Sequence, residues 1–391
     1  MKVLFVCPFV PWPLENGGKI RTFHLVREAA RHVEVHLRLV REPGGTPGAE
    51  EALAPHCASL ELHERSSPGP VRRLARPKLE RWFHSESLRA SLAASLATGD
   101  FDLVHLDELL LSRSLPPGTS VPVVQHHHKL DTVLYDLLWS HAGATKHFDL
   151  WKLRRLERES TRRTPWHLFC SQGDADFLQG RHGGLFPGVV PSGFDPASFA
   201  PATPPAPREP GRLLFLGSMD YGPNVDGVGH FVRETLPRIV AAEPRTRLDI
   251  VGSVPPAEVR ALEDGHVHVT GRVPEVRPFL EKAAAMVVPL RIGGGTRLKI
   301  VEALALETPV VSTAVGAEGL GLADGEHLRL ADDPEGFAAA TLALLAEPEA
   351  AARLARQGRD HVQRHYRWEV LGEALVTYWR RAAAAGTRTR S

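Results

Sequence analysis

Apolar runs, each long enough for one β-strand, alternate with amphipathic stretches in the first half of the chain. The run KVLFVC at 2–7 is followed by a proline- and glycine-containing loop and then by a helical pattern from about Lys19 to Arg31. Further strands are predicted at 33–40, 59–63, 102–106, 121–125 and 167–170. Helical patterns separate most of these strands, which predicts right-handed crossovers and a parallel sheet.

The same alternation resumes after a break near the middle of the chain. Residues 196–211, PASFAPATPPAPREPG, are predicted to form a linker, because proline fixes φ and removes backbone donors. After it, strands are predicted at 212–216, 247–251, 266–269, 285–289, 309–312 and 327–330. The last segment, 333–386, is predicted to be helical throughout.

These two series of strands and helices predict an α/β fold with two doubly wound, Rossmann-like domains. The first domain is assigned to 1–195 and the second to 212–391, whose terminal helices could pack back on the first. Open parallel sheets bind ligands beyond the carboxyl ends of their strands. Two such domains are therefore expected to face each other across a binding cleft.

Composition narrows the class of protein. With 391 residues, the chain is long enough for two cores, and its formal net charge of +1 argues against a general polyanion binder. The cysteines Cys7, Cys57 and Cys170 form no disulfide or metal pattern, which indicates a reducing, cytoplasmic location. The apolar start is short and broken by prolines, unlike a secretory leader, and no run is long enough to span a bilayer.

The most informative stretch is VVPLRIGGGTRLKIVEALALETPVVST at 287–313. It predicts a strand, a glycine loop at the carboxyl end of that strand and a following helix, whose first N–H groups suit a phosphate. On this helix Lys299 and Glu302 share the face opposite to the apolar residues. The two side chains could hold a diphosphate and the hydroxyls of its sugar. An exposed Lys–Glu pair on an ordinary helix is the alternative.

Together with several other segments, this stretch resembles glycosyltransferase family 4, whose members are retaining enzymes with the GT-B fold. FLGSMDYGPNVDGVGHFVRETLPRI at 215–239 resembles the opening of the family's second domain, and VTGRVPEVRPFLEKAAAMVVPL at 269–290 resembles its nucleobase loop and next strand. CSQGDADFL at 170–178 and VPSGFDPASF at 190–199 resemble the segments that close the first domain. The GGGTRLK form resembles a sub-branch associated with exopolysaccharide assembly.

The resemblance implies a donor site in the second domain. Glu302 corresponds to the ligand of the donor ribose hydroxyls, and Arg272 and Val273 correspond to the backbone that frames the nucleobase. The backbone amides that face phosphate or sugar correspond to those of Gly294, Gly295 and Thr296.

The chain departs from the family pattern at three positions that usually touch sugar or diphosphate. The first glutamate of the usual motif falls on Gly294, and the usual arginine and lysine fall on Ser218 and Asn224. Ser218 remains a candidate substrate-binding residue. We infer that Arg297 and Lys299 supply the lost positive charge, because either side chain can neutralise a diphosphate.

The first domain contributes a glycine pair, Gly17 and Gly18, in the segment ENGGKIR. By resemblance it matches the glycine loop after the first strand, where donor phosphate and acceptor approach. A tight turn between strand and helix is the structural alternative.

Three adjacent histidines occur in QHHHKLD at 125–131. The resemblance favours His128 as the histidine beside the transferred sugar, where it would hydrogen-bond the sugar and position the reacting centre. A histidine can also carry a proton near neutral pH. The alternative is that His126 or His127 points into the core. Zinc is not expected, because neighbours in an extended chain point in alternating directions.

Two stretches of the first domain are strongly basic, 65–81 and 146–163. A basic amphipathic surface that includes Trp151 could bind anionic lipid or a lipid-diphosphate acceptor. A solvated helix face with Arg–Glu pairs is the alternative. A nucleic acid partner is not expected, since no recognition-helix pattern or aromatic–basic RNA motif occurs.

The sequence therefore predicts a retaining glycosyltransferase that moves sugar from a nucleoside-diphosphate sugar to a hydroxyl of a glycan, lipid-linked or small-molecule acceptor. No cofactor or metal is expected beyond the donor, and the expected location is cytoplasmic, with peripheral contact at the inner face of the membrane. The main rival is a catalytically inactive GT-B subunit that acts as a binding scaffold. A nicotinamide-dependent dehydrogenase is weaker, because no G-x-G-x-x-G follows the first strand.

Overall fold

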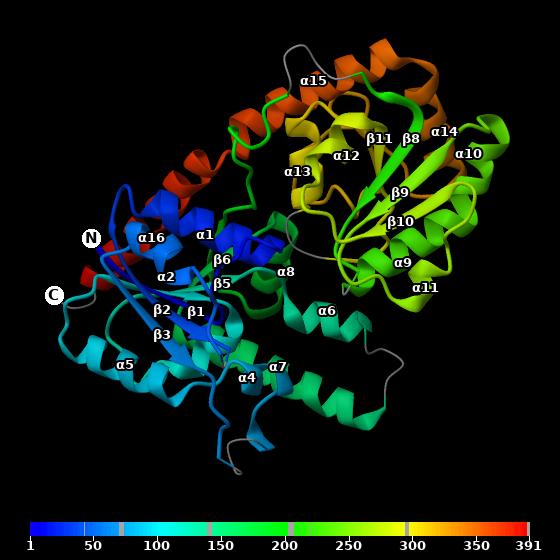
Figure 1. The fold of residues 1–391 in the computed structure, drawn as a ribbon. Helices are drawn as coiled ribbons and strands as arrows, with labels where there is room; N and C mark the ends of the chain where they lie inside the picture. Colours follow the sequence, from blue (N-terminus) through cyan, green and yellow to red (C-terminus); the bar gives the residue numbers. More distant parts are fainter. Residues whose placement is uncertain are drawn as a thin grey trace. The chain divides into compact units, whose positions relative to one another are not determined.

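The structure is a computed structural model, and it describes residues 1–42, 44–69, 74–138, 143–201, 207–219, 221–293 and 297–388. The chain forms two compact units (Figure 1). The first comprises Met1–Pro191 together with Trp368–Ser391, and the second comprises Ser192–Arg367. The units therefore divide at Pro191 and Arg367, whereas the sequence placed the domain limits at 195 and 212.

The first unit is built on a seven-stranded parallel sheet in the order β3-β2-β1-β4-β5-β6-β7. Its strands are β1 (Lys2–Cys7), β2 (Glu34–Arg41), β3 (Ser59–Glu64), β4 (Leu103–Asp107), β5 (Val123–His127), β6 (Trp166–Phe169) and β7 (Phe186–Val189). The six predicted strands are present, and β7 is an addition. Its sequence FPGV contains proline and glycine, which are poor strand formers, so periodicity could not reveal it.

The fifth strand is displaced from its predicted position at 121–125. β5 begins after Pro122, which lacks an N–H donor, and ends at His127. His126 pairs in register with Asp107 of β4. Two of the three adjacent histidines therefore belong to the strand, and His128 is the first residue after it.

Helices cover both faces of this sheet (Figure 1). α1 begins at Gly17, because the side chain of Asn16 caps it by accepting a hydrogen bond from the backbone N–H of Lys19. The core that α1 shares with α16 lies on one face of β1, and the core that contains α5 lies on the other. The helices are α1 (Gly17–Ala29), α2 (Ala49–Leu53), α4 (Lys78–Trp82), α5 (Glu86–Ala97), α6 (Asp131–Leu138), α7 (Ala144–Arg163), α8 (Gln172–His182) and α16 (Trp368–Arg388), with 3-10 turns η1 (Ala54–His56) and η2 (Leu109–Ser114).

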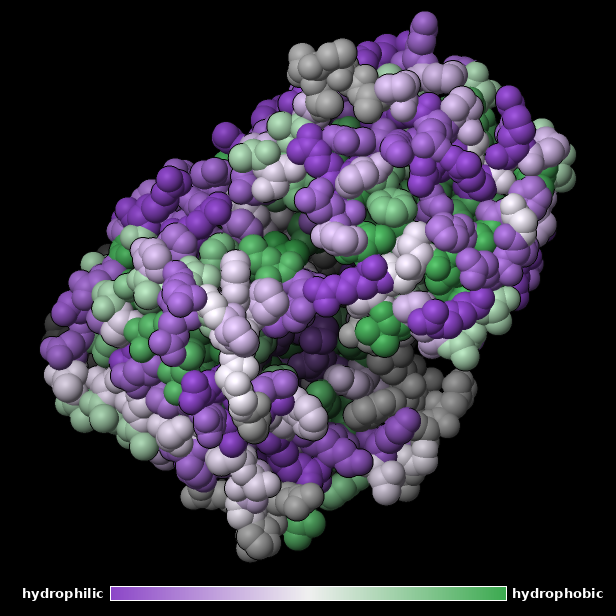
Figure 2. Space-filling view, in the orientation of Figure 1, coloured by the Kyte–Doolittle hydropathy of each residue, from purple (hydrophilic) through white to green (hydrophobic). Residues whose placement is uncertain are grey.

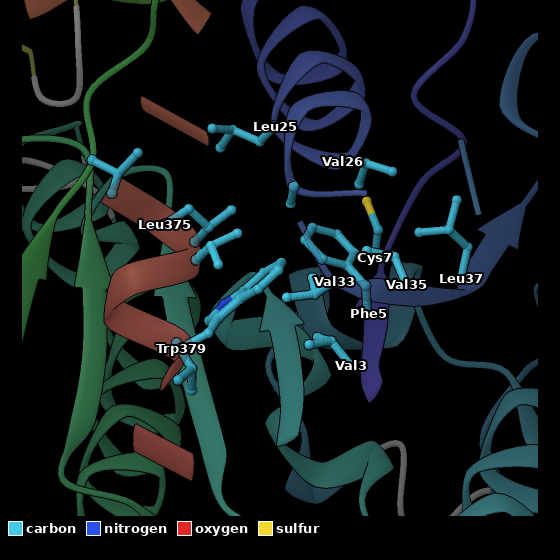
Figure 3. Packing of buried hydrophobic residues seen from close by; sticks show 14 of the residues in the cluster. Val3, Phe5, Cys7, Leu25, Val26, Val33, Val35, Leu37, Leu375 and Trp379 are labelled. Carbon is cyan, nitrogen blue, oxygen red and sulfur yellow. The ribbon is translucent and has the colours of Figure 1, made fainter. Parts of the chain in front are cut away.

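The last helix, α16, completes the core of the first unit. Trp379 is fully buried, and its ring meets that of Phe5 in β1 edge to face, with the centroids 6.2 Å apart. Figure 3 shows Leu375 and Trp379 pointing from α16 toward the residues of β1. A tryptophan of this size contributes much of the apolar area that a core buries, so α16 is an integral part of this unit.

The second unit is built on a six-stranded parallel sheet in the order β10-β9-β8-β11-β12-β13. Its strands are β8 (Glu209–Leu216), β9 (Arg247–Val251), β10 (Val267–Gly271), β11 (Ala283–Val288), β12 (Val310–Ser312) and β13 (Arg329–Leu330). Its helices are α9 (Gly222–His230), α10 (Leu236–Ala242), α11 (Ala257–Arg260), α12 (Arg277–Lys282), α13 (Leu298–Ala305), α14 (Pro334–Ala346) and α15 (Pro348–His365), with the π-helical segment η3 (Phe231–Thr235) between α9 and α10. Alternating residues of β8 face two cores, Leu214 with α13 and Leu213 with α14.

Two predictions of extent need correction. The segment 196–211 is not a linker throughout, because β8 starts at Glu209, where it pairs with β11. The segment 333–386 is helical over most of its length, as predicted, but it forms three helices with short breaks between them. It is divided before Pro348, which has no N–H to continue α14, and again between α15 and α16.

Polar residues cover most of the face seen in Figure 2, and smaller hydrophobic areas lie between them. Among the helices that the structure describes, none combines the length and apolarity that crossing a bilayer demands. Several large hydrophobic side chains are nevertheless exposed, notably Trp82, Phe148 and Trp151 of the first unit.

Candidate functional site

In the second unit, the candidate residues gather where β8 ends and α13 begins. Nζ of Lys299 donates to Oδ1 of Asn224 at 2.8 Å, and it lies 4.7 Å from the centre of the Phe215 ring. The side-chain amide of Asn224 in turn donates to the carbonyl oxygen of Ser218 at 2.8 Å. A Cβ at Gly217 would come within 2.8 Å of Nζ, so glycine leaves room for the ammonium group against the backbone.

The charges of Lys299 and Glu302 are poorly solvated, although both side chains are only half-buried. Burial lowers the pKa of Lys299 to about 7, with a further contribution from the Arg297 charge, while Glu302 opposes the shift. Burial likewise raises the pKa of Glu302 to about 8, against the opposing effect of Lys299. The exposed Lys–Glu pair considered from the sequence is therefore not present. A lysine held in this state gains from an incoming anion.

Arg297 lies at the N-cap position of α13 and is 5% exposed. Its Nη2 donates to the carbonyl of Val315 at 3.3 Å and packs against Gly293, where a Cβ would stand 3.0 Å from that nitrogen. Its guanidinium group thus lies close to the start of the helix. The neighbouring candidates Gly294, Gly295 and Thr296 lie outside the described residues.

The remaining candidates of this unit are more dispersed. Oγ of Ser218 is 2.8 Å from Oγ of Ser253, the second residue after the end of β9. Arg272 and Val273 follow β10, the outer strand of the sheet. Arg272 is exposed, whereas Val273 packs on the core below α13. The structure brings Ser218 together with Lys299 through Asn224, and it places the two residues after β10 at the sheet margin.

In the first unit, the candidates gather where β4 and β5 end beside the start of α1. Nε2 of His128 lies 2.8 Å from Oδ1 of Asp107, and Nδ1 lies 3.6 Å from Oε1 of Glu108. A Cβ at Gly18 would be 3.8 Å from Nδ1, so this glycine borders the ring. A Cβ at Gly17 would meet no atom of the described residues within 4 Å.

The other two histidines of QHHHKLD belong to the interior. His126 and His127 are buried in β5, and Nε2 of His127 lies 2.9 Å from Nδ1 of His167. Burial holds the pKa of both His126 and His127 well below the ordinary value, so both rings are neutral. Among the three, only His128 is partly accessible, which is the arrangement that favours it as the site residue.

Asp107 is the centre of a buried hydrogen-bond network that connects three elements. Its carboxylate accepts from Oγ1 of Thr22 at 2.7 Å and from the His126 and His128 rings at 2.8 Å each. Burial opposes its ionisation, but the His128 charge and the histidine donors prevail and hold the pKa of Asp107 well below its usual range. Asp107 is therefore an ionised, acceptor-only group.

Donor-only partners fix the tautomers of the histidines around Asp107. Trp379 donates its indole N–H to Nδ1 of His105 at 3.0 Å, and the Arg21 guanidinium lies 2.9 Å from Nε2 of His126. Indole and guanidinium groups cannot accept hydrogen bonds. The neutral rings must therefore carry their protons on the opposite nitrogens, Nε2 of His105 and Nδ1 of His126, which face Asp107.

This network contains residue types that bind metals, but their hydrogen-bond partners are unsuitable for metal ligands. Ligand atoms of His105, Asp107 and His126 lie within 4.8 Å of one another. A metal-bound histidine normally donates its other N–H to an acceptor. Here the other nitrogens face the donors Trp379 and Arg21, so a metal would require both rings as anionic imidazolates. The three residues do not fit a divalent cation.

Asp107 and Glu108 were not among the residues singled out from the sequence. Glu108 has φ 133° and ψ 142°, close to a region populated almost solely by glycine. It is buried, and burial raises the pKa of its carboxyl against the lowering effects of Lys129 and His128. One feature of the sequence could have identified both residues: they directly follow the carboxyl end of the strand predicted at 102–106.

The basic surface of the first unit consists partly of ion pairs. On α7, Arg154 pairs with Asp136 and Arg155 pairs with Glu159. Phe148 and Trp151 are exposed and stack with their centroids 5.7 Å apart. The exposed cations Arg158 and Arg162 lie further along the same helix. Part of the other basic stretch, 70–73, lies outside the described residues.

Two family models match the chain. One, described as Glycosyltransferase Family 4, matches residues 16–198, and the other, described as Glycosyl transferases group 1, matches residues 210–347. The phosphatidyl-myo-inositol mannosyltransferase of Mycolicibacterium smegmatis is 30% identical over 307 residues, which span 75% of this chain and 75% of that protein.

Solved structures show the same fold at lower identity. Sucrose-phosphate synthase from Thermosynechococcus elongatus matches with a TM-score of 0.76 at 19% identity, over 98% of this chain and 100% of that one. Anabaena HepE, solved in complex with UDP and glucose, matches with a TM-score of 0.68 at 14% identity, over 96% and 98%. At these identities the likeness concerns the fold alone.

Proposed function

This chain belongs to glycosyltransferase family 4 and is a glycosyltransferase that uses a nucleotide-sugar donor, and on that premise we propose that it transfers the sugar with retention of anomeric configuration. The acceptor is a hydroxyl of a glycan, a lipid-linked sugar or a small molecule. Retention is inferred from the family, whereas the diphosphate donor is supported by Lys299, which is held by Asn224 above Phe215 with its pKa lowered to about 7. Such a lysine is prepared to accept the charge of a diphosphate.

The donor roles are those that the family resemblance implies, and we propose them for this chain. Lys299 and Arg297 neutralise the diphosphate, and the amides of Gly294, Gly295 and Thr296 contact phosphate or sugar. Glu302 accepts from the ribose hydroxyls, and Arg272 and Val273 frame the base. Ser218, held by Ser253 and next to Asn224, contacts the donor where the family usually has an arginine. That HepE was solved with UDP and glucose supports this donor class.

The transfer step uses charge stabilisation rather than a tightly bound ion. As the anomeric bond breaks, negative charge grows on the leaving diphosphate, and Arg297 and Lys299 stabilise it. The acceptor hydroxyl attacks from the same face, and its proton leaves with the departing phosphate. His128 hydrogen-bonds the transferred sugar, and Gly17 and Gly18 leave space for donor phosphate and acceptor. No metal is needed if these cations suffice.

We propose a cytoplasmic location with a peripheral membrane contact, and the exposed surface of the first unit supports the contact. The exposed Phe148 and Trp151, followed by Arg158 and Arg162, combine apolar and cationic groups on one helix. The similar protein from Mycolicibacterium smegmatis is named a phosphatidyl-myo-inositol mannosyltransferase, and this name supports a lipid-linked acceptor.

The proposal is tested by incubating the protein with a panel of nucleoside-diphosphate sugars and candidate acceptors. We expect release of nucleoside diphosphate with one donor class and, by NMR, a product whose anomeric configuration equals that of the donor. Inversion would overturn the retaining assignment. Donor binding without turnover or donor hydrolysis, across the panel, would instead favour the inactive scaffold.

The role of Glu302 has its own test. Glu302→Gln removes the carboxyl with little change of size. Above about pH 8, where this carboxyl is ionised in the free protein, affinity for a ribonucleoside diphosphate should fall, while affinity for its 2′,3′-dideoxy analogue should not. If calorimetry shows both affinities falling alike, Glu302 is not the ribose ligand.

A further inference from the structure

The protonation of His128 is constrained by its neighbour Asp107. Asp107 is ionised and can only accept, so Nε2 of His128, 2.8 Å away, must carry a hydrogen. In the neutral ring the other nitrogen, Nδ1, is then bare. Nδ1 is the atom that faces Gly18 and Glu108.

Glu108 places a second proton acceptor beside that bare nitrogen. Its Oε1 lies 3.6 Å from Nδ1, and its other oxygen, Oε2, is buried with no hydrogen-bond partner among the residues that the structure describes. A carboxylate facing a nitrogen lone pair is repulsive, and a buried carboxylate oxygen without a hydrogen-bond donor is costly, even though the Lys129 ammonium lies 4.0 Å from Oε1. At least one proton must therefore reside on this pair.

The surrounding charges limit the pair to one proton. The charged groups near it are Arg21 and Lys129, which are cationic, and Asp107 and Asp131, which are anionic. The other titratable neighbours, Cys7, Cys170 and Tyr135, are neutral because burial raises their pKa values. His105 and His126 are neutral with fixed tautomers. Only a single proton on the His128–Glu108 pair leaves this buried cluster without net charge.

The backbone of Glu108 gives an independent sign that this side chain serves the site. A glutamate at φ 133° occupies a conformation that glycine adopts without cost. Residues held in such conformations concentrate at functional sites, where the surrounding structure maintains the strain. In this conformation the Glu108 carboxyl lies beside Nδ1 of His128.

We propose that His128 and Glu108 hold one proton between Nδ1 and the Glu108 carboxyl, and that Asp107 is the positioning residue that keeps this proton on the Nδ1 side of the ring. The proton moves within the pair. Transfer requires the 3.6 Å between Oε1 and Nδ1 to shorten to hydrogen-bond distance. When the carboxyl O–H bond then breaks and the Nδ1–H bond forms, glutamic acid becomes glutamate and the imidazole becomes imidazolium. The ring can therefore face a sugar hydroxyl as donor or acceptor while the cluster keeps its net charge. This inference deepens the proposed role of His128 and rests on that role for its use in transfer.

The proton count can be measured on the full chain without any substrate. We would label histidine with ¹⁵N, assign His128 by the loss of its signals in His128→Gln, and follow both ring nitrogens by NMR between about pH 5 and 8. The expected spectrum shows Nε2 protonated throughout, and Nδ1 at a shift between the protonated and bare values that hardly changes with pH. In Glu108→Gln the amide cannot hold the proton, so the ring should titrate as a single imidazole.

Asp136→Asn is the matched control, because it removes an exposed carboxylate that pairs with Arg154 away from the cluster. It should leave the His128 signals unchanged. The proposal is overturned if wild-type Nδ1 titrates over the same range as in Glu108→Gln, or if the proton of the neutral ring is on Nδ1. The wild-type spectrum alone decides this, even where Glu108→Gln does not fold. A correct proton count with no transfer activity would contradict the proposed function and leave the pair intact.

Discussion

The indole N–H of Trp379 donates to Nδ1 of His105 at 3.0 Å, across 274 positions of sequence. The last helix thereby fixes the tautomer of a histidine in the fourth strand, and that ring faces Asp107. The carboxylate beneath the candidate site is thus oriented by residues from β4, β5, α1 and α16. Packing and site chemistry in this unit depend on the same side chains.

Trp379→Phe should lower the free energy of unfolding of the first unit by more than the lost ring volume implies. Nδ1 of His105 would be left buried without its donor, which costs about 1–3 kcal/mol in the free energy of unfolding. Denaturant titration measures this loss, and ¹⁵N NMR should show the His105 tautomer released. Trp151→Phe, at an exposed tryptophan of α7, serves as the control and should change neither quantity.

Lys299→Ala should weaken binding of a nucleoside diphosphate much more than binding of the nucleoside. Losing a charge-assisted phosphate contact typically costs about 1.5–3 kcal/mol. Calorimetry with both ligands measures the difference. Arg291→Ala removes an exposed cation that pairs with Asp226 nearby, and it should affect neither ligand. Equal losses for both ligands in Lys299→Ala would contradict the phosphate assignment.

Binding of the diphosphate should take up a proton at slightly alkaline pH. Lys299 has its pKa lowered to about 7 in the free protein and regains its charge beside the phosphate. The bound-state pKa is the higher one, so affinity is fully present below about 7 and falls as pH rises above it. Calorimetry in buffers of different ionisation heat counts the proton. The measurement should be made in the Glu302→Gln variant, because the Glu302 carboxyl has a pKa of about 8 and would otherwise exchange protons in the same pH range.

Glu108→Gly should make the protein more stable and less active. Glycine adopts φ 133° without strain, and relieving such a conformation is worth about 1–3 kcal/mol in the free energy of unfolding. Activity should fall because the proton-sharing carboxyl is gone. Glu108→Ala is the matched comparison: it loses the same carboxyl but keeps the Cβ, so activity should fall without the gain in stability.

Vesicle binding should depend on the exposed residues of α7 and not on its ion-paired arginines. Arg158→Gln with Arg162→Gln should reduce cosedimentation with anionic vesicles at low salt, each cation contributing about 1 kcal/mol. Phe148→Ser with Trp151→Ser should reduce it as well. Arg154→Gln with Arg155→Gln removes arginines already paired with Asp136 and Glu159, so its effect should be smaller. Vesicle binding that does not depend on lipid charge or salt concentration would rule out an electrostatic contribution from these arginines.

Local periodicity predicted the strands and helices that carry the site better than it predicted the strand pairings and side-chain contacts between them. β1 and the amphipathic start of α13 follow directly from apolar spacing, which placed Lys299 and Glu302 on one face. Pro122 accounts for the later start of β5, but the end of β5 at His127 depends on pairing with β4, which no single segment encodes. The strained backbone of Glu108 and the contact of Trp379 with His105 arise from tertiary packing, so neither had a signal in the local sequence. Resemblance selected His128, whereas Asp107 was identified from the structure, although its position directly after a predicted strand was a signal in the sequence.

The return of α16 to the first unit has a consequence for how the protein is made. A ribosome that has released Met1–Pro191 has supplied every strand of the first sheet but not the helix that covers Phe5. The entire second unit must be synthesised before Trp379 emerges. During that interval the nascent chain exposes an apolar face, and chaperones have their best opportunity to bind it.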